Sequence, residues 1–228
     1  MIEVQKFELL SKNKLTNDIY EMEFNWDKEI KFLNWQFITF LLPKIWWRAY
    51  SILKNDWKKI VLIIKKREKI DWWRWWSKFI CELEIWDVLK WVWPAWDFTL
   101  KKNNNNKLFL WTWTWFVPLY NQIKWALQNK LTWKICFIFW VRNLSDVFYE
   151  NKLKFLKTNF SNFDYKIYLS RENKQMYNYW YITQFLTQKN IKNFEEFYIC
   201  WTKTMIDGSK NILNKHNVVN EKIFTEKY

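Results

Sequence analysis

The sequence predicts two domains of different fold class: an N-terminal antiparallel β-barrel, residues 1–100, and a C-terminal doubly wound parallel α/β sheet, residues 107–228. Three observations predict them. The N-terminal part holds short β-rich runs at close spacing, which is typical of a small barrel. Apolar runs then alternate with helical patterns, which indicates parallel strands joined by helices. Between these two sequence patterns, the polar run KKNNNN at residues 101–106 predicts a linker.

Apolar or β-branched runs between turn-forming residues predict barrel strands at 2–10, 19–24, 36–42, 48–53 and 59–66. The pattern SKFICELE at 77–84 interrupts them, and we expect this helix to cap the barrel. In the second domain we expect strands at 107–110, 134–139, 165–169 and 196–200. The helical patterns lie at 118–128, 145–156 and 181–188, with a last one from about residue 203.

Composition limits the cellular setting. The 228 residues can bury a sizeable core, and they hold neither an apolar run of about 18 residues nor a basic-then-apolar leader. Cys81, Cys136 and Cys200 lie far apart without C-x-x-C spacing, which argues against a metal or iron–sulfur centre. We therefore expect a cytoplasmic chain without a membrane span.

The net charge of +14 comes mainly from lysine. Arginine, the better residue for recognising bases and phosphates, is scarce, so the charge does not predict a nucleic-acid partner. Two explanations stay open. One is a solvated lysine surface produced by codon usage, and the other is docking of an acidic protein partner by electrostatic attraction.

Tryptophan stands where glycine is expected. The chain has 21 Trp and a single Gly, Gly208, whereas an ordinary chain contains about 7% glycine. The tryptophans gather in turn, bulge and cap contexts such as KIWWRAY, DWWRWWSK and WVWPAW. We hypothesise that they are glycines encoded by UGA in an AT-rich genome, and we expect many of them in turns, exposed or projecting into the cofactor cleft. The alternative is a Trp-rich carbohydrate or membrane binder, in which tryptophans would cluster on one face.

The stretch LFLWTWTWFVPL predicts a nucleotide-binding turn. With glycine restored it becomes a buried strand, a glycine-rich turn and a helix, in which backbone N–H groups can bind a pyrophosphate. A plain strand-to-helix connection is the alternative. The candidate cofactor-binding residues in this stretch are Thr112, Trp113, Thr114, Trp115 and Pro118.

A series of motifs in order resembles the ferredoxin-NADP reductase family over nearly the whole chain. NWQFITFLLP is similar to the family's G-Q-x-hydrophobic strand, and RAYS at 48–51 matches its R-x-Y-[ST] flavin motif. WWRWWSKF resembles the turn that binds the FAD pyrophosphate, and WDVLKWVWPAWDFTL resembles G-D-x(5)-G-P-x-G-x-F. TWFVP and CWTKTM resemble T-G-[IT]-[AT]-P and C-G-x-x-x-M.

The resemblance implies a FAD site on the barrel. Arg48 would neutralise the diphosphate with its planar, permanently charged group. Tyr50 would stack on the isoalloxazine ring, and Ser51 would reach the flavin N5 edge. Ala49, between Arg48 and Tyr50, is also a candidate cofactor-binding residue. Taken alone, RAYS also fits an alternating edge strand. The pyrophosphate would also bind at the start of the capping helix, at Trp75, Trp76 and Ser77, where the alternative for Ser77 is an ordinary helix cap.

The resemblance also implies a nicotinamide site on the second domain. The nicotinamide would lie against Cys200 and Trp201, although Thr202 stands where the family often has proline. A buried core cysteine is the alternative. At the C-terminus, Glu226 and Tyr228 would be the acid and the aromatic that cover the flavin until nicotinamide displaces the ring, unless this end is frayed.

Three residues favour NADPH over NADH. An adenosine 2′-phosphate needs cations or hydroxyls after the second and third strands of the sheet, where the sequence has Arg142, Ser170 and Arg171. The Ser-Arg pair resembles that of NADPH-using reductases. NADH stays open, because an arginine at the first place also occurs in NADH users.

The family implies hydride transfer between NAD(P)H and FAD across a cleft between the domains, and electron exchange with an acidic carrier such as ferredoxin or flavodoxin. The proposed catalytic residues are Tyr50, Ser51, Cys200 and Glu226. A flavin-binding electron-transfer subunit of a larger redox complex is the alternative. The C-terminal cysteine cluster of the dihydroorotate dehydrogenase electron-transfer subunits does not occur in this sequence.

Overall fold

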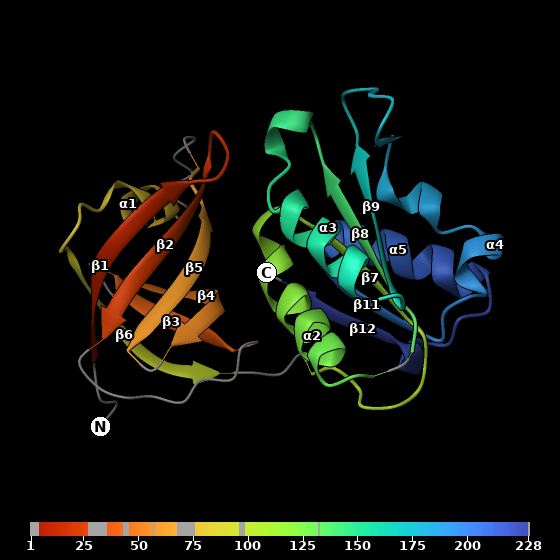
Figure 1. Ribbon diagram of the computed structural model, residues 1–228, viewed down its shortest axis with the longest axis horizontal. Coiled ribbons are helices and arrows are strands. Elements are labelled where there is room, and N and C mark those ends of the chain that lie inside the picture. Colours follow the sequence, from red (N-terminus) through yellow and green to blue (C-terminus); the bar gives the residue numbers. More distant parts are fainter. Residues whose placement is uncertain are drawn as a thin grey trace. The chain divides into compact units, whose positions relative to one another are not determined.

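The computed structural model divides the chain into two compact units, Met1–Asp97 (unit 1) and Phe98–Tyr228 (unit 2) (Figure 1). Each unit has its own sheet and its own core. Among the described residues, no helix is long and apolar enough to cross a membrane. The residues that the structure describes are 5–26, 36–42, 46–56, 58–67, 76–95, 99–131 and 133–227.

Unit 1 is a closed antiparallel β-barrel, as the sequence predicts. Its strands are β1 (Gln5–Lys14), β2 (Ile19–Trp26), β3 (Phe37–Leu42), β4 (Trp46–Asp56), β5 (Lys59–Lys65) and β6 (Val88–Ala95), in the order β1-β2-β5-β4-β3-β6. The sequence did not predict β6, because Pro94 cannot donate a ladder hydrogen bond. The structure accommodates this proline where the β3–β6 register shifts, between Phe37 and Thr39.

Alternate side chains of the strands fill the barrel. In β2, Met22, Phe24 and Trp26 are buried whereas the residues between them are partly exposed. This alternation is the period-2 pattern of a strand with one face on a core. Ile80 and Cys81 of α1 (Trp76–Glu82) belong to the same buried cluster, so α1 packs on the barrel core as predicted.

Unit 2 is a parallel sheet with helices on both faces, which confirms the predicted class. Its strands are β7 (Lys107–Thr112), β8 (Ile135–Val141), β9 (Phe163–Leu169), β10 (Asn178–Tyr179), β11 (Glu196–Trp201) and β12 (Ile223–Lys227), in the order β10-β9-β8-β7-β11-β12. Its helices are α2 (Phe116–Gln128), α3 (Glu150–Asn159), α4 (Gln188–Ile191) and α5 (Lys203–Lys215). Short 3₁₀ turns are η1 (Trp113–Trp115), η2 (Leu144–Asp146), η3 (Ile182–Phe185) and η4 (Asn220–Lys222).

Both faces of the sheet are covered. Every side chain of β7, β8 and β11 is buried, which is the pattern of parallel strands between helical layers. On one face, the ring of Phe116 in α2 lies 4.7 Å from that of Trp111 and 6.0 Å from that of Phe137. On the other face, Ile206 and Leu213 of α5 join the buried cluster. Figure 1 shows α2 and α3 in front of the sheet and α5 behind it.

Two predicted helices of unit 2 are shorter than the sequence indicates. The helix expected at 145–156 begins only at Glu150, because Tyr149 adopts a left-handed backbone with φ of 59°. The helix expected at 181–188 is divided into η3 and α4 by the extended backbone of Thr187. The sequence also missed β10 and β12, since edge strands of two and five residues are too short for a clear alternation.

The polar run at 101–106 is hydrogen-bonded to unit 2. The backbone N–H groups of Glu195 and Glu196 donate to the carbonyl of Asn106, at 3.0 and 3.2 Å. The N–H of Lys101 donates to the hydroxyl of Tyr198 at 3.0 Å. In this structure the predicted linker therefore lies against the sheet of unit 2.

A buried ion pair joins the amino ends of β7 and β11. Lys107 and Glu196 are register partners, their side chains are 0% and 4% exposed, and Nζ lies 3.2 Å from Oε2. Lys107 also donates to Asn103 Oδ1 (2.7 Å), and Glu196 accepts from Asn105 Nδ2 (2.9 Å) and from the Tyr198 hydroxyl (2.9 Å). Burial alone would raise the pKa of Glu196, but hydrogen bonds from Asn103 and Asn105 and the charge of Lys107 outweigh it and lower that pKa. The carboxylate is therefore ionised and paired.

Glu196→Ala should destabilise unit 2 by about 3–5 kcal/mol, because it leaves the Lys107 ammonium buried without a counter-charge. Hydrogen exchange of peptides from β7 and β11 measures this as a lower free energy of opening. The matched control is Glu221→Ala, at an exposed position of η4, with an expected change within about 0.5 kcal/mol. Equal protection of β7 in both variants would contradict the prediction.

Candidate nucleotide and flavin sites

The carboxyl ends of the parallel strands gather the predicted site residues of unit 2. The chain passes from β7 to β8 and β9 on one side of β7, and then to β11 and β12 on the other side. Strand order therefore reverses between β7 and β11, and open α/β sheets bind ligands at the carboxyl edge beside such a point. Thr112 ends β7, and Cys200, which is paired with Trp111, lies at the same end of β11.

The turn after β7 has the predicted strand, turn and helix form. The Thr112 side chain is fully buried, and its hydroxyl donates to the carbonyl of Trp140 at 2.5 Å. Trp113, Thr114 and Trp115 form η1 and are partly exposed. The helix α2 follows directly, with Pro118 in its first turn, where proline costs no hydrogen bond. The N-cap residue Trp115 makes no side-chain cap hydrogen bond, whereas the N–H of Phe116 donates to the carbonyls of Trp113 and Thr114.

Arg142, Ser170 and Arg171 are brought together at the ends of β8 and β9. The N–H of Arg171 donates to the carbonyl of Arg142 at 2.9 Å, and the N–H of Ser170 donates to that of Val141 at 3.1 Å. Both arginines are exposed, and the Arg142 guanidinium lies 5.2 Å from the centroid of the Trp113 ring. No carboxylate in the described part of the chain forms an ion pair with either arginine.

Cys200 and Glu226 are brought together by the pairing of β11 with β12. They are register partners, and the Cys200 Sγ lies 3.8 Å from a carboxylate oxygen of Glu226, to which it donates. Cys200 is fully buried, and burial, followed by the negative charge of Glu226, raises the pKa of its thiol well above the ordinary value. The sulfur is therefore a protonated donor rather than a thiolate nucleophile. Beside it, the buried Trp201 ring lies 5.1 Å from that of Trp140.

The residues of the RAYS motif lie together on β4 of unit 1. Arg48–Ser51 are partly exposed and pair with β3, whereas the pairing of β4 with β5 begins further along the strand. The Tyr50 ring lies 5.8 Å from that of Phe40. Burial raises the pKa of Tyr50, and the positive charges of Arg48 and Arg67 partly offset this. Arg48 is thus within electrostatic range of Tyr50.

The start of α1 holds a buried hydroxyl. Trp76 is the first residue of the helix and is 2% exposed, and Ser77 is the second. Within the described part of the chain, nothing forms a hydrogen bond with the buried Ser77 Oγ. Because such an unpartnered group costs about 1–3 kcal/mol, a ligand or water partner is expected there. Trp75 and Tyr228 lie outside the described residues.

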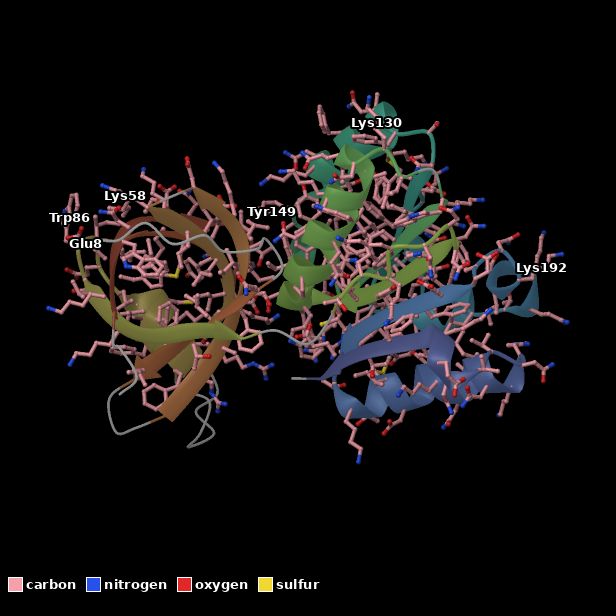
Figure 2. The ribbon with its side chains drawn as sticks, turned by 90° about the horizontal axis from the view of Figure 1, so that it is seen from below. Glu8, Lys58, Trp86, Lys130, Tyr149 and Lys192 are labelled. Atoms are coloured by element: carbon pink, nitrogen blue, oxygen red, sulfur yellow. The ribbon has the colours of Figure 1, made fainter. Side chains whose placement is uncertain are left out.

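Several tryptophans adopt backbone conformations that favour glycine. Of the six described residues with positive φ, three are tryptophan: Trp86 at 80°, Trp113 at 48° and Trp180 at 95°. A side chain in the left-handed region costs about 1–2 kcal/mol. Trp86 is 66% exposed and lies at the outside of unit 1 (Figure 2), and Trp180 is 44% exposed.

The expectation that many tryptophans lie in turns or are exposed holds for Trp86 and Trp180, but it does not extend to all described tryptophans. Six of them are buried, namely Trp26, Trp76, Trp111, Trp133, Trp140 and Trp201. Among the residues that the structure describes, no hydrogen-bond partner is found for the buried indole N–H of Trp111, Trp133 or Trp140. Each such donor carries a desolvation cost that a glycine at the same place would not have.

Two side chains beside the loop that follows β9 belong to no predicted site. The hydroxyl of Tyr177 donates to Glu150 Oε2 at 2.9 Å. The two residues are 27 positions apart and belong to no motif, so no sequence signal could have paired them.

A closed antiparallel barrel and a doubly wound parallel sheet together also form the fold of solved ferredoxin-NADP reductase-like structures. No protein-family model and no curated protein sequence matches the chain. Solved structures do share the fold. The ferredoxin-NADP+ reductase from Plasmodium falciparum with 2′P-AMP has a TM-score of 0.80 at 21% identity, over 99% of this chain and 97% of that one.

Two further structures are similar over the whole of this chain. The ferredoxin NADP+ reductase from Neisseria gonorrhoeae with bound FAD and NADP has a TM-score of 0.82 at 13% identity, over 99% of that chain. The cytochrome P450 reductase GcoB of Amycolatopsis has a TM-score of 0.84 at 15% identity, over 71% of that chain. At these identities the similarity establishes the two-unit fold.

Proposed function

We propose that the chain is a FAD-dependent oxidoreductase that transfers hydride between NAD(P)H and FAD and exchanges electrons with a carrier protein. One observation carries the proposal: the turn after β7, Arg142, Arg171 and Cys200 meet at one edge of the sheet of unit 2. The fold supports it, because ferredoxin-NADP+ reductases with FAD, NADP or 2′P-AMP share both units. Residues 1–100 would bind FAD and residues 107–228 NAD(P)H, on either side of the linker 101–106.

The residues of unit 1 fit a flavin dinucleotide. Arg48 would neutralise its diphosphate, Tyr50 would pack against the flavin ring, and Ser51 would present a hydroxyl to the reacting edge. The buried, unpartnered hydroxyl of Ser77 at the start of α1 would find an acceptor in the pyrophosphate. Bound FAD would supply hydride acceptance and electron release, which no side chain of the chain provides.

The residues of unit 2 fit a nicotinamide dinucleotide with an additional phosphate. Arg142 and Arg171 place two guanidinium groups at adjacent strand ends, which suits the 2′-phosphate of NADPH and favours it over NADH. Cys200 would pack against the nicotinamide, with Glu226 holding its thiol proton. Thr112 would support the turn from inside, because its hydroxyl is already bonded to the carbonyl of Trp140.

An acidic carrier such as ferredoxin or flavodoxin is the proposed partner. The net charge is +14, and most of the excess positive charge lies in unit 2, which would steer an acidic protein toward the chain. A flavin-binding subunit of a larger redox complex is the second candidate. Its support is that the same two-unit fold also forms part of a longer chain, as in GcoB.

We also propose that glycine replaces tryptophan in the protein made by its own cells, through UGA codons decoded as glycine. The left-handed backbones of Trp86, Trp113 and Trp180 and the unpartnered indoles of Trp111 and Trp140 support this. At about 1–2 kcal/mol for each left-handed side chain and about 1–3 for each buried donor, these costs rival a total stability of about 5–15 kcal/mol.

With glycine at the 21 positions, the full chain should purify yellow with FAD and be reduced by NAD(P)H, whereas the chain as printed should not. Arg48→Ala should weaken FAD binding by about tenfold or more, because it removes a charge-assisted contact to the diphosphate. Fluorescence titration of the apoprotein with FAD measures this. The control is Lys54→Ala, which removes the same charge from an exposed position of β4. A folded, colourless protein that cannot take up FAD would refute the proposal.

Arg171→Ala should lower kcat/KM for NADPH by about tenfold and leave that for NADH nearly unchanged, since only NADPH carries the 2′-phosphate. Steady-state reduction of a dye acceptor with each nucleotide gives the ratio. Lys192→Ala, at an exposed position labelled in Figure 2, is the control. If the ratio is the same in Arg171→Ala and the parent, NADPH is not the preferred donor.

The intact mass of the protein from its source cells should fall below the mass of the printed chain by the Trp-to-Gly difference at most of the 21 positions. Peptide mass spectrometry should then locate glycine at 86, 113 and 180, where the backbone is left-handed. Tryptophan at these positions in the source protein, or UGG codons in the gene, would contradict the recoding.

A further inference from the structure

The loop between β9 and β10 carries Ser170 and Arg171 and is tied at both of its ends. At its start, the N–H of Arg171 donates to the carbonyl of Arg142 at 2.9 Å. At its end, the N–H of Tyr177 donates to the carbonyl of Lys174 at 2.9 Å, and Asn178 Nδ2 donates to the carbonyl of Ile167 at 3.1 Å. The loop has no glycine or proline, so its shape depends on such contacts.

Glu150 provides the side-chain contact that joins this loop to α3. Its Oε2 accepts the hydroxyl hydrogen of Tyr177 at 2.9 Å, and its Oε1 lies 3.0 Å from the Nζ of Lys154. The Glu150 side chain is 23% exposed and lies in the first turn of α3, where the helix dipole stabilises a carboxylate. Burial and the hydrogen bond to Glu150 both raise the pKa of Tyr177, so the hydroxyl remains a donor.

The other described acidic residues near the two arginines are turned toward backbone groups. Asp146 Oδ2 accepts the N–H of Asn143 at 3.0 Å. Glu172 Oε2 accepts the N–H of Leu144 at 3.4 Å. Within the described part of the chain, neither of these carboxylates forms an ion pair with Arg142 or Arg171, so both guanidinium groups are available to an anion from solution.

We propose that Glu150 is a positioning residue for this anion site: through Tyr177 it holds the loop 170–177 so that Arg171 stays beside Arg142 and both bind the 2′-phosphate of an adenine nucleotide. The inference rests on the proposed function, since it deepens the NADPH assignment. It assigns a role to a residue that lies outside every motif of the sequence.

Repulsion and positioning predict opposite changes in phosphate binding when the Glu150 carboxylate is neutralised. A carboxylate near a phosphate repels it, so Glu150→Gln should strengthen phosphate binding if charge is all that matters. If Glu150 positions the loop, the same substitution weakens its hydrogen bond from Tyr177 and should weaken phosphate binding. The sign of the change therefore separates the two roles.

The experiment is isothermal titration calorimetry with adenosine 2′,5′-bisphosphate and adenosine 5′-monophosphate, which differ only in the 2′-phosphate. The protein for this experiment is the full chain. At the 21 tryptophan positions it has the residues that mass spectrometry identifies in the protein from its source cells. Glu150→Gln should raise the Kd of the bisphosphate about threefold to tenfold and leave that of the monophosphate within about twofold. Glu221→Gln, which removes the same charge from exposed η4, should change neither value.

Tyr177→Phe removes the donor and keeps the ring, so it tests the same contact if Glu150→Gln folds poorly. It should have an effect of similar size, and the double variant should be no weaker than either single variant, because both remove one interaction. Unchanged or tighter bisphosphate binding in Tyr177→Phe or folded Glu150→Gln overturns the positioning role while the proposed function stands. If the parent chain binds neither nucleotide, the nucleotide part of the proposed function fails, and the inference fails with it.

Discussion

The pairing of β7 with β11 is the constraint on which unit 2 depends. Lys107 and Glu196 face each other at the amino ends of these strands, and both side chains are buried. A slip of β11 by one residue would turn Glu196 to the opposite face of the sheet, away from Lys107, at a cost of several kcal/mol. The same register sets Cys200 opposite Trp111 at the carboxyl ends. A contact far from the candidate site therefore decides which residues meet in it.

Pairing between neighbouring strands also sets which residues are opposite each other in the rest of the sheet. The ladder of β11 with β12 sets Glu226 opposite Cys200, and the strand ends of β8 and β9 set Arg171 beside Arg142. Parallel strands all present their carboxyl ends at one edge, so residues from distant parts of the chain become neighbours without any local signal. In the barrel, the four consecutive residues Arg48–Ser51 lie along β4 and pair with β3.

The tryptophans mark the places where local and overall structure disagree. The overall fold is consistent with the period and order of the apolar runs, yet Trp86 and Trp180 occupy left-handed turns, and Trp111 is buried with no partner for its N–H among the described residues. In natural sequences the local conformational preference of a residue usually agrees with the overall fold, and exceptions are confined to a few functional positions. Tryptophan accounts for three of the six described residues with positive φ, and Lys130, Tyr149 and Asn217 are the others.

The fold class, the order of most strands and helices, and the turn after β7 follow from sequence patterns, because hydrophobic period and turn residues are local properties. The sequence pattern does not predict β6, because Pro94 interrupts it, and it does not predict the short edge strands β10 and β12. That the run 101–106 contacts a buried ion pair and that Glu150 meets Tyr177 is visible only in three dimensions. Such contacts join residues far apart in the chain, and burial and register, which no local pattern encodes, select the partners.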